Sequence, residues 1–191
     1  ELISLEKEWN DLLALSASHV PFLRHEYITA WWQRLGGGEW EKAELFTVTA
    51  YDEAGKLIGI APMFLTENKD GEPALLLLGS IEISDYLDVI ARPEDVPAFI
   101  EALLGYLEGE SLPGCHLVDW YNLLEGSPTI FALRTASEKT GWVYQEQPLQ
   151  HCPYIPLPGD WEKYICNIDK KQRHEIRRKI RRSEEYYLPV K

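Results

Sequence analysis

The sequence predicts an α/β domain with a mixed central sheet, flanking helices and a long basic helix at its C-terminal end. Three observations lead to this fold class. Apolar residues recur at helical spacing in two N-terminal stretches, strand-forming runs then surround a turn, and strands and helices alternate over the remainder. A chain of 191 residues is long enough to build one such domain and to bury its core.

Two helices are expected first. Apolar residues follow helical spacing at Leu5, Trp9, Leu12 and Leu13 and, after Pro21, at Tyr27, Trp31 and Leu35. The second helix is expected to stop at Gly36, because glycine readily takes the left-handed conformation that ends a helix.

Strands are expected next. The runs "AELFTVTAY" and "KLIGIAPMFL" favour a hairpin around the turn at residues 52–55, and "ALLLLG" is typical of a buried strand. Two further strands are predicted at "SDYLDVIA" and "CHLVDWYNL", separated by a helix over about 94–107.

Helix signals dominate the last third of the chain. Ser127 and Pro128 are expected to open a helix that ends at Gly141. The segments "WVYQEQ" and "CPYIPL" are predicted to be extended, and a short helix is expected to start at Asp160. A long helix over about 169–186 is capped by Asp169 with Gln172, and "YYLPVK" after it has the composition of a strand just beginning.

The stretch "WWQRLGGGEW" contains Gln33-x-x-Gly36-x-Gly38, a spacing that fits the pyrophosphate loop of acetyl-CoA-dependent acyltransferases. Such a loop needs a strand before it and a helix after it, so that the positive helix N-terminus faces the anion. Here the predicted helix precedes the loop and its carbonyl-rich end would repel an anion. The stretch is therefore interpreted as a helix stop followed by a turn.

Charge is distributed unevenly. Residues 169–191 carry nine Lys or Arg against four Asp or Glu, whereas residues 1–168 carry ten against 27. An acidic body repels nucleic acid, so any anion site has to be local.

Cysteine and histidine spacing predicts no metal site, because no CxxC or HExxH motif occurs. The three separated cysteines are interpreted as reduced thiols, mostly core residues, of a cytoplasmic protein: Cys115, Cys152 and Cys166. The sequence contains no run of 18 apolar residues, so no membrane span is predicted.

Two groups of acidic and aromatic residues are candidate sites. Asp85 and Asp88, on either side of Tyr86, are expected to share one face at the start of a central strand, where they would hold an acceptor amine or act as a general base. The alternative is that Asp85 caps a turn and Asp88 is partly exposed. Asp119 and Tyr121 are likewise expected to share a strand face and bind a cationic acceptor; the alternative there is an edge carboxylate beside a core tryptophan, Trp120.

The basic helix "KKQRHEIRRKIRR" carries the strongest charge feature. An apolar seam of Ile176 and Ile180, extended to Tyr187, runs beside a basic stripe of Lys170, Arg173, Arg177 and Arg181, with Arg178 and Arg182 on the other side. Docking on the acidic body or on another domain is the first interpretation. Binding of a CoA or nucleotide phosphate is the second, and nucleic-acid binding is a distant third.

The order of the segments "FLRHEYITAWWQRLGG", "KLIGIAPMFL", "LLGSIEISDYLDVIA", "DWYNLLEGSPT" and the long basic helix resembles a known family. It is similar to the N-terminal half of bacterial GNAT-superfamily acetyltransferases of the CelD- or BioF2-like type, distant relatives of the Fem-type aminoacyl transferases. The resemblance covers about 21–191, and its most specific parts are Ser84–Asp88 and the helix at 170–182.

The resemblance implies a GNAT-like N-terminal domain over residues 1–168. Residues 169–191 would then be the basic helix and the start of a second GNAT-like domain that the chain does not contain. It also implies an acyltransferase that moves an acyl group from acetyl-CoA, or another acyl-CoA, to an amine or hydroxyl, for example of a sugar or an envelope precursor. Within it, Asp85 and Asp88 would be catalytic, and Tyr86, Asp119 and Tyr121 would bind the acceptor.

The donor is expected to bind mainly outside this chain, with Arg177 and Arg178 as its contacts here and no metal. The alternative function is a non-catalytic GNAT-like domain that recognises a substrate or a partner.

Overall fold

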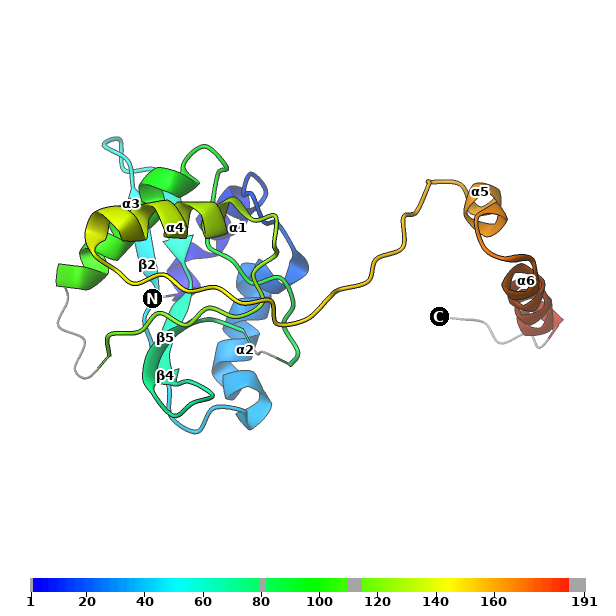
Figure 1. The fold of residues 1–191 in the computed structure, drawn as a ribbon, viewed down its shortest axis with the longest axis horizontal. Helices are drawn as coiled ribbons and strands as arrows, with labels where there is room; N and C mark the ends of the chain where they lie inside the picture. Colours follow the sequence, from blue (N-terminus) through cyan, green and yellow to red (C-terminus); the bar gives the residue numbers. More distant parts are fainter. Residues whose placement is uncertain (1, 80–81, 110–114, 186–191) are drawn as a thin grey trace. The chain divides into compact units, whose positions relative to one another are not determined.

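The structure is a computed structural model of the chain, and it describes residues 2–79, 82–109 and 115–185 (Figure 1). The chain divides into two compact units, Glu1–Gln147 (unit 1) and Pro148–Lys191 (unit 2). The division therefore falls between residues 147 and 148, whereas the sequence placed a boundary between 168 and 169. Each unit is described by itself.

Unit 1 opens with the two predicted helices, α1 (Glu6–Leu13) and α2 (His25–Gly38), each preceded by a short 3-10 helix at Leu2–Leu5 and Pro21–Leu23. Trp9 of α1 is fully buried, and its indole nitrogen Nε1 donates a hydrogen bond of 2.8 Å to the carbonyl of Leu23. This bond fixes the chain between the two helices.

The end of α2 confirms the predicted helix stop. Leu35, Gly36 and Gly37 have φ angles of 45°, 64° and 79°, so the right-handed helix gives way to a left-handed turn. A Cβ at Gly36 would also be tightly placed, at 3.2 Å from the Trp31 ring and from Oε2 of Glu39. With the carbonyl end of a helix and a carboxylate beside it, this turn is unsuited to a pyrophosphate.

Two three-stranded sheets, β1–β4–β5 and β2–β3–β6, meet at Pro62, which separates β3 (Leu57–Ala61) from β4 (Met63–Glu67). Along one side run β1 (Glu44–Leu45) and β2 (Val48–Tyr51), and along the other run β5 (Pro73–Leu77) and β6 (Ile90–Ala91). All pairings between these strands are antiparallel. The predicted hairpin is confirmed by the β2–β3 pairing and its turn at 52–55.

A segment is looped out of the sheet between β5 and β6. Met63 pairs with Leu77, and the amide of Leu78 donates to the carbonyl of Pro62 (2.7 Å). Ile60 pairs with Ile90, which is ten positions beyond the partner that the β4–β5 register would give it. We call residues 78–79 and 82–89 the excursion loop.

Two predicted strands are wrong for most of their length. Of "SDYLDVIA" only Ile90–Ala91 is a strand, because residues 84–89 belong to the excursion loop. "CHLVDWYNL" forms a single parallel bridge, Leu75 with Val118, flanked by hydrogen bonds from Leu75 to Leu117 and from Asp119 to Leu75. The fold class is nevertheless α/β, with antiparallel sheets and one parallel contact.

Helices α3 (Val96–Gly109) and α4 (Pro128–Thr140) lie side by side in unit 1 (Figure 1). The predicted caps of α4 are confirmed, since the Ser127 side chain accepts from the amide of Thr129 and Gly141 is left-handed. Phe99 of α3 lies directly over Gly59 of β3, so this helix packs against the sheet.

Unit 2 contains α5 (Trp161–Cys166) and α6 (Lys170–Glu185). Asp160 caps α5 and Asp169 caps α6 through their carboxylates, as predicted. The seam residue Tyr187, the expected helix end at Tyr186 and the "YYLPVK" strand lie outside the described residues. No helix in the described parts of either unit is long and apolar enough to cross a membrane.

Replacing Gly59 by alanine should destabilise unit 1. A Cβ at this position would lie 2.4, 2.6 and 2.7 Å from three ring carbons of Phe99, which overpacks the contact between β3 and α3. We expect a loss of about 1–3 kcal/mol in the free energy of unfolding, measured by urea denaturation. The matched control is Gly105→Ala in α3, where a Cβ meets nothing within 4 Å; it should be neutral or stabilising by up to about 1 kcal/mol.

Candidate functional site

A buried carboxylate holds the base of the excursion loop. Asp88 is 1% exposed, and its Oδ2 accepts hydrogen bonds of 2.6 Å from the hydroxyls of Ser18 and Ser127. Its Oδ1 accepts a bond of 2.8 Å from the amide of Val89. Both serines are themselves buried, so the carboxylate exchanges water for three protein donors.

These bonds join three separate parts of the chain. Ser18 follows α1, in a segment that also pairs with β6 through the amide of Ala17 and the carbonyl of Ala91. Ser127 is the N-cap of α4. Asp88 therefore fixes the excursion loop to the chain after α1 and to the start of α4.

The outer part of the excursion loop is held at Ser84. Its hydroxyl lies 2.7 Å from the hydroxyl of Tyr27 on α2, and its carbonyl accepts a bond of 2.8 Å from the Asn122 side chain. Asn122 has a φ of 62° and Tyr86 a φ of 59°, unusual values for residues other than glycine. Strained backbone of this kind gathers at functional sites, which draws attention to this surface.

A second cluster lies at the turn between β4 and β5. Oδ2 of Asp119 accepts bonds from the Asn68 amide (2.9 Å) and from the Tyr121 hydroxyl (2.7 Å). Oδ1 of Asn68 in turn accepts from the backbone amides of Asp70 and Glu72 and so shapes the turn. Burial and the hydrogen bond to Asp119 raise the pKa of Tyr121 to about 12.

Contacts made by Lys69 join the two clusters. Its ammonium lies 5.9 Å from the centre of the Tyr121 ring and 3.9 Å from a carboxylate oxygen of Glu82 in the excursion loop. Together with the bond from Asn122 to Ser84, this places residues 82–86 beside residues 119–122. We call these two stretches, with Tyr27, Asn68 and Lys69, the acidic–aromatic surface.

The residues predicted to form the site lie on two different segments and differ in burial. Asp85 is exposed and Tyr86 is half-buried on the excursion loop, and Asp119 and Tyr121 meet as expected although their segment is not a strand. The expectation that Asp85 and Asp88 share a strand face is wrong, because the segment is a loop and one carboxylate is exposed while the other is buried. Trp120 packs against the core.

Six residues of this arrangement were not predicted from the sequence: Ser18, Tyr27, Asn68, Lys69, Glu82 and Asn122. Ser84 was noted only as part of the segment Ser84–Asp88. A signal exists for Asn68, because Asn followed by a Gly three positions later is typical of a turn ordered by the asparagine side chain. Ser18, Tyr27 and Asn122 are single polar residues that lie far in the sequence from the residues they contact.

The two predicted donor-binding arginines are engaged in ion pairs within unit 2. Arg177 contacts Glu162 of α5 at 2.6 Å, and Arg178 contacts Glu175 one turn earlier at 2.6 Å. Arg173, expected in the basic stripe, donates instead to the carbonyls of Cys166 and Ile168 at the end of α5. These bonds hold α5 and α6 together.

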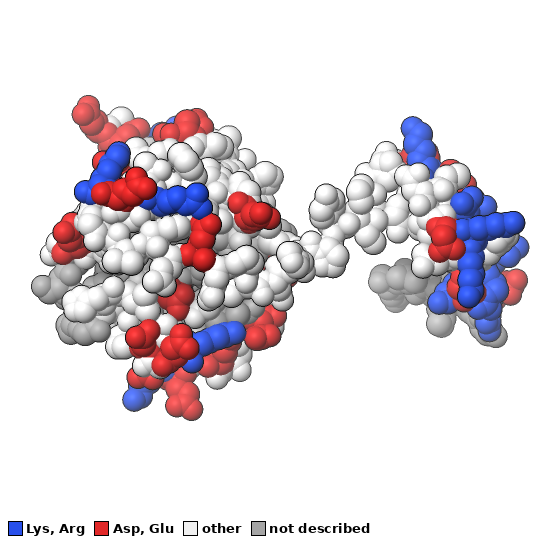
Figure 2. Space-filling view, viewed as in Figure 1, with Lys and Arg blue, Asp and Glu red and all other residues white. Residues whose placement is uncertain are grey.

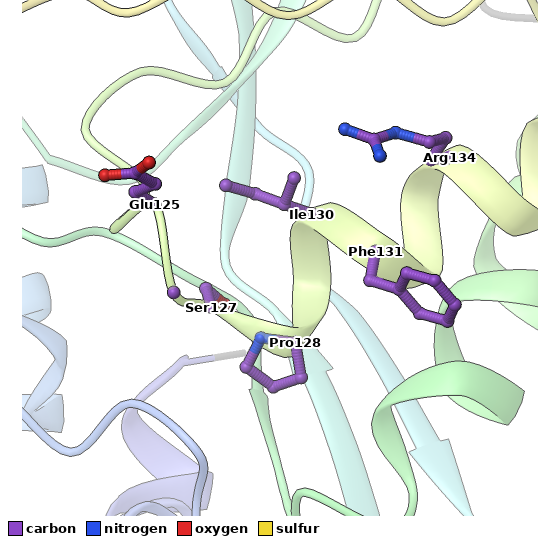
Figure 3. Close-up of a pocket in the computed structure, with 7 residues that line it drawn as sticks. Glu125, Ser127, Pro128, Ile130, Phe131 and Arg134 are labelled. Atoms are coloured by element: carbon purple, nitrogen blue, oxygen red, sulfur yellow. The ribbon is translucent and has the colours of Figure 1, made fainter.

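Unit 1 also carries an open depression of about 330 Å³ at the start of α4 (Figure 3). Ser127, Ile130 and Phe131 line it, with Glu125 across from Arg134. Arg134 is paired with Glu146 (2.7 Å) and lies over the Tyr144 ring. None of the sequence-predicted site residues lines this depression.

The expectation that the cysteines are mostly core residues is wrong for two of the three. Cys115 is buried, whereas Cys152 and Cys166 are exposed, and all three are free thiols. In the described residues no three His, Cys, Asp or Glu side chains are grouped so that they could hold a metal ion.

Comparison with known proteins gives no match to a family model, to a curated protein or to a solved structure.

Removing the Asp88 carboxylate should destabilise unit 1 strongly. Asp88→Ala leaves two buried hydroxyls and one amide without their acceptor, and we expect a loss of about 3 kcal/mol in the free energy of unfolding. Asp85→Ala, which removes an exposed carboxylate three residues earlier, should change it by less than about 0.5 kcal/mol. Equal effects of the two variants in urea denaturation would contradict the role assigned to Asp88.

The raised pKa of Tyr121 should make stability fall at alkaline pH. Between the ordinary value of 10.0 and about 12, this phenol is ionised in the unfolded chain and protonated in the fold. The contribution of Tyr121 to the free energy of unfolding is therefore complete below pH 10 and is lost as the pH rises towards 12. Tyr121→Phe should show a shallower fall of the urea midpoint between about pH 9 and about pH 12, while Tyr51→Phe, which alters an exposed side chain, should follow the wild type. Parallel profiles for both variants would contradict this assignment.

Proposed function

We propose that the chain is a GNAT-like domain that serves as the acceptor-recognising half of an acyltransferase. The observation that carries this proposal is the acidic–aromatic surface, where the exposed carboxylates of Glu82 and Asp85 on the excursion loop lie close to the half-buried Tyr121. Carboxylates beside aromatic rings suit an acceptor that carries an ammonium or hydroxyl group. The position of Lys69 over Tyr121 and near Glu82 is an example of such a contact made by the chain itself.

The fold supports the GNAT-like part of the proposal. An antiparallel β2–β3 and β4–β5 arrangement is followed by α3 and by a return at Val118 that is parallel to β5. Antiparallel strands with one parallel neighbour and helices at their sides are what a GNAT-like mixed sheet requires. This likeness concerns architecture and comes from the order of elements alone.

The proposed reaction is direct transfer. The acceptor nitrogen or oxygen attacks the thioester carbonyl of an acyl-CoA, a C–N or C–O bond forms, and the C–S bond breaks to release CoA. The acceptor proton passes to a carboxylate or through water, and the departing thiolate takes up a proton. Asp85 is the proposed proton acceptor because it is exposed on the surface. Asp88 is proposed as a positioning residue, since its oxygens are buried and occupied.

The second candidate is a non-catalytic domain that recognises a substrate or a partner. It is favoured by the ion pairs of Arg177 and Arg178, which occupy the cations expected to contact the donor. The unsuitability of the turn at Gly36 for a pyrophosphate points the same way.

A calorimetric titration with acetyl-CoA separates the two functions. The acyltransferase proposal predicts binding that weakens by about tenfold in Arg177→Ala/Arg178→Ala, through the loss of charge-assisted phosphate contacts. Glu162→Ala is the matched variant, because it breaks the same α5–α6 ion pair but leaves the Arg177 cation available. It should bind acetyl-CoA at least as tightly as the wild type.

The opposite pattern has a clear meaning. No heat at about millimolar acetyl-CoA, where even a contact worth about 4 kcal/mol is measurable, would contradict donor binding by this chain and favour the recognition domain. Equal weakening in Glu162→Ala would show that the double variant acts by separating α5 from α6.

A further inference from the structure

One side of α6 is rich in exposed cations, several of which form no ion pair. The helix has eight Lys or Arg and three Glu over its 16 residues. Three of its arginines are engaged, Arg173 with carbonyls of α5, Arg177 with Glu162 and Arg178 with Glu175. Within the described part of the helix four cations form no ion pair, Lys170, Lys171, Arg181 and Arg182, and all four are exposed.

Helical spacing gathers these cations on one side. Residues four, seven or eight, and eleven apart share a face, so Lys170, His174, Arg177 and Arg181 align and Lys171, Arg178 and Arg182 lie next to them. Glu184 and Glu185 fall on the same side at the end of the helix. At 1.5 Å per residue the helix is about 24 Å long, so the face is long and straight. Figure 2 shows Lys and Arg gathered on the α6 part of unit 2, whereas acidic side chains are spread over unit 1.

Unit 2 also exposes aromatic and aliphatic side chains just before and within α5. Tyr154, Ile155, Leu157 and Trp161 are 87%, 67%, 77% and 51% exposed. Leu157, Trp161 and Tyr164 line an open depression of about 320 Å³. The ion pair from Glu162 to Arg177 ties the residue next to Trp161 to the middle of α6, so apolar and basic groups occur within one small unit.

We propose that unit 2 binds the surface of an anionic phospholipid bilayer, with the basic face of α6 on the headgroups and Trp161 and its apolar neighbours at the headgroup–acyl boundary. The charges are complementary, and each Lys or Arg near such a surface contributes about 1 kcal/mol. Tryptophan and aliphatic side chains beside a basic helix are the composition of elements that lie in the interface plane. The inference is independent of the acyltransferase proposal.

Other polyanions fit less well. A nucleic-acid groove offers phosphates to α6 but no apolar region for Ile155 and Leu157, which a bilayer provides. The acidic charge of unit 1, nine Lys or Arg against 25 Asp or Glu over residues 1–147, opposes any polyanion. At physiological salt such opposition is screened over about 8 Å.

Co-sedimentation of the full chain with vesicles tests the proposal. Vesicles of phosphatidylcholine containing about 30% phosphatidylglycerol should bind the chain, and vesicles of phosphatidylcholine alone should bind it far less. Arg181→Gln/Arg182→Gln should lower the partition coefficient by about 30-fold, from two charges near the surface. The matched control, Arg34→Gln/Lys56→Gln, removes two exposed cations from unit 1 and should leave it unchanged. Trp161→Ser should weaken binding severalfold without altering its salt dependence, and circular dichroism checks that α6 remains folded.

Three results would overturn the proposal. The first is no co-sedimentation with anionic vesicles at low salt, or equal binding to both vesicle types. The second is equal weakening by the control pair, which would show an effect of net charge alone. The third is release from the vesicles by duplex DNA at the same phosphate concentration, which would identify α6 as a nucleic-acid contact.

Discussion

The arrangement of unit 1 depends on one buried carboxylate. Asp88 closes the excursion loop by accepting three hydrogen bonds from the chain after α1, from the N-cap of α4 and from its own neighbour. Without these bonds, burying the charge would be strongly unfavourable. Since both serines are also buried, removal of any one partner leaves polar groups unsatisfied, and the three segments are held as a set.

The excursion loop then explains where the acidic–aromatic surface lies. Pro62 separates β3 from β4. The chain leaves the strand pairing after β5, opposite this break, and β6 pairs with β3 ten positions beyond the β4–β5 register. Ser84 meets Tyr27 and Asn122, and Glu82 meets Lys69. A surface built from a helix, a loop and a turn is therefore positioned by the sheet beneath it.

Local signals were predictable from the sequence and long-range pairings were not. The stop of α2, the Ser127 and Asp160 caps and the β2–β3 turn depend on neighbouring residues, and the structure confirms them. The strand expected at residues 84–91 has good strand composition, but its register is set by contacts with Ser18 and Ser127, 70 and 39 residues away. The proximity of Asp119 and Tyr121 was predicted from their spacing. Asn68 reaches Asp119 from a turn, and Asn122 has a positive φ angle, so neither position follows from residue spacing.

Hydrogen exchange of the Asp88→Asn variant tests most directly whether one carboxylate joins these segments. The account predicts that amides of residues 16–18, 84–91 and 127–130 lose protection together, while those of the β2–β3 hairpin keep theirs. Faster exchange confined to residues 88 and 89 would contradict it, because the three segments would then be held independently of Asp88.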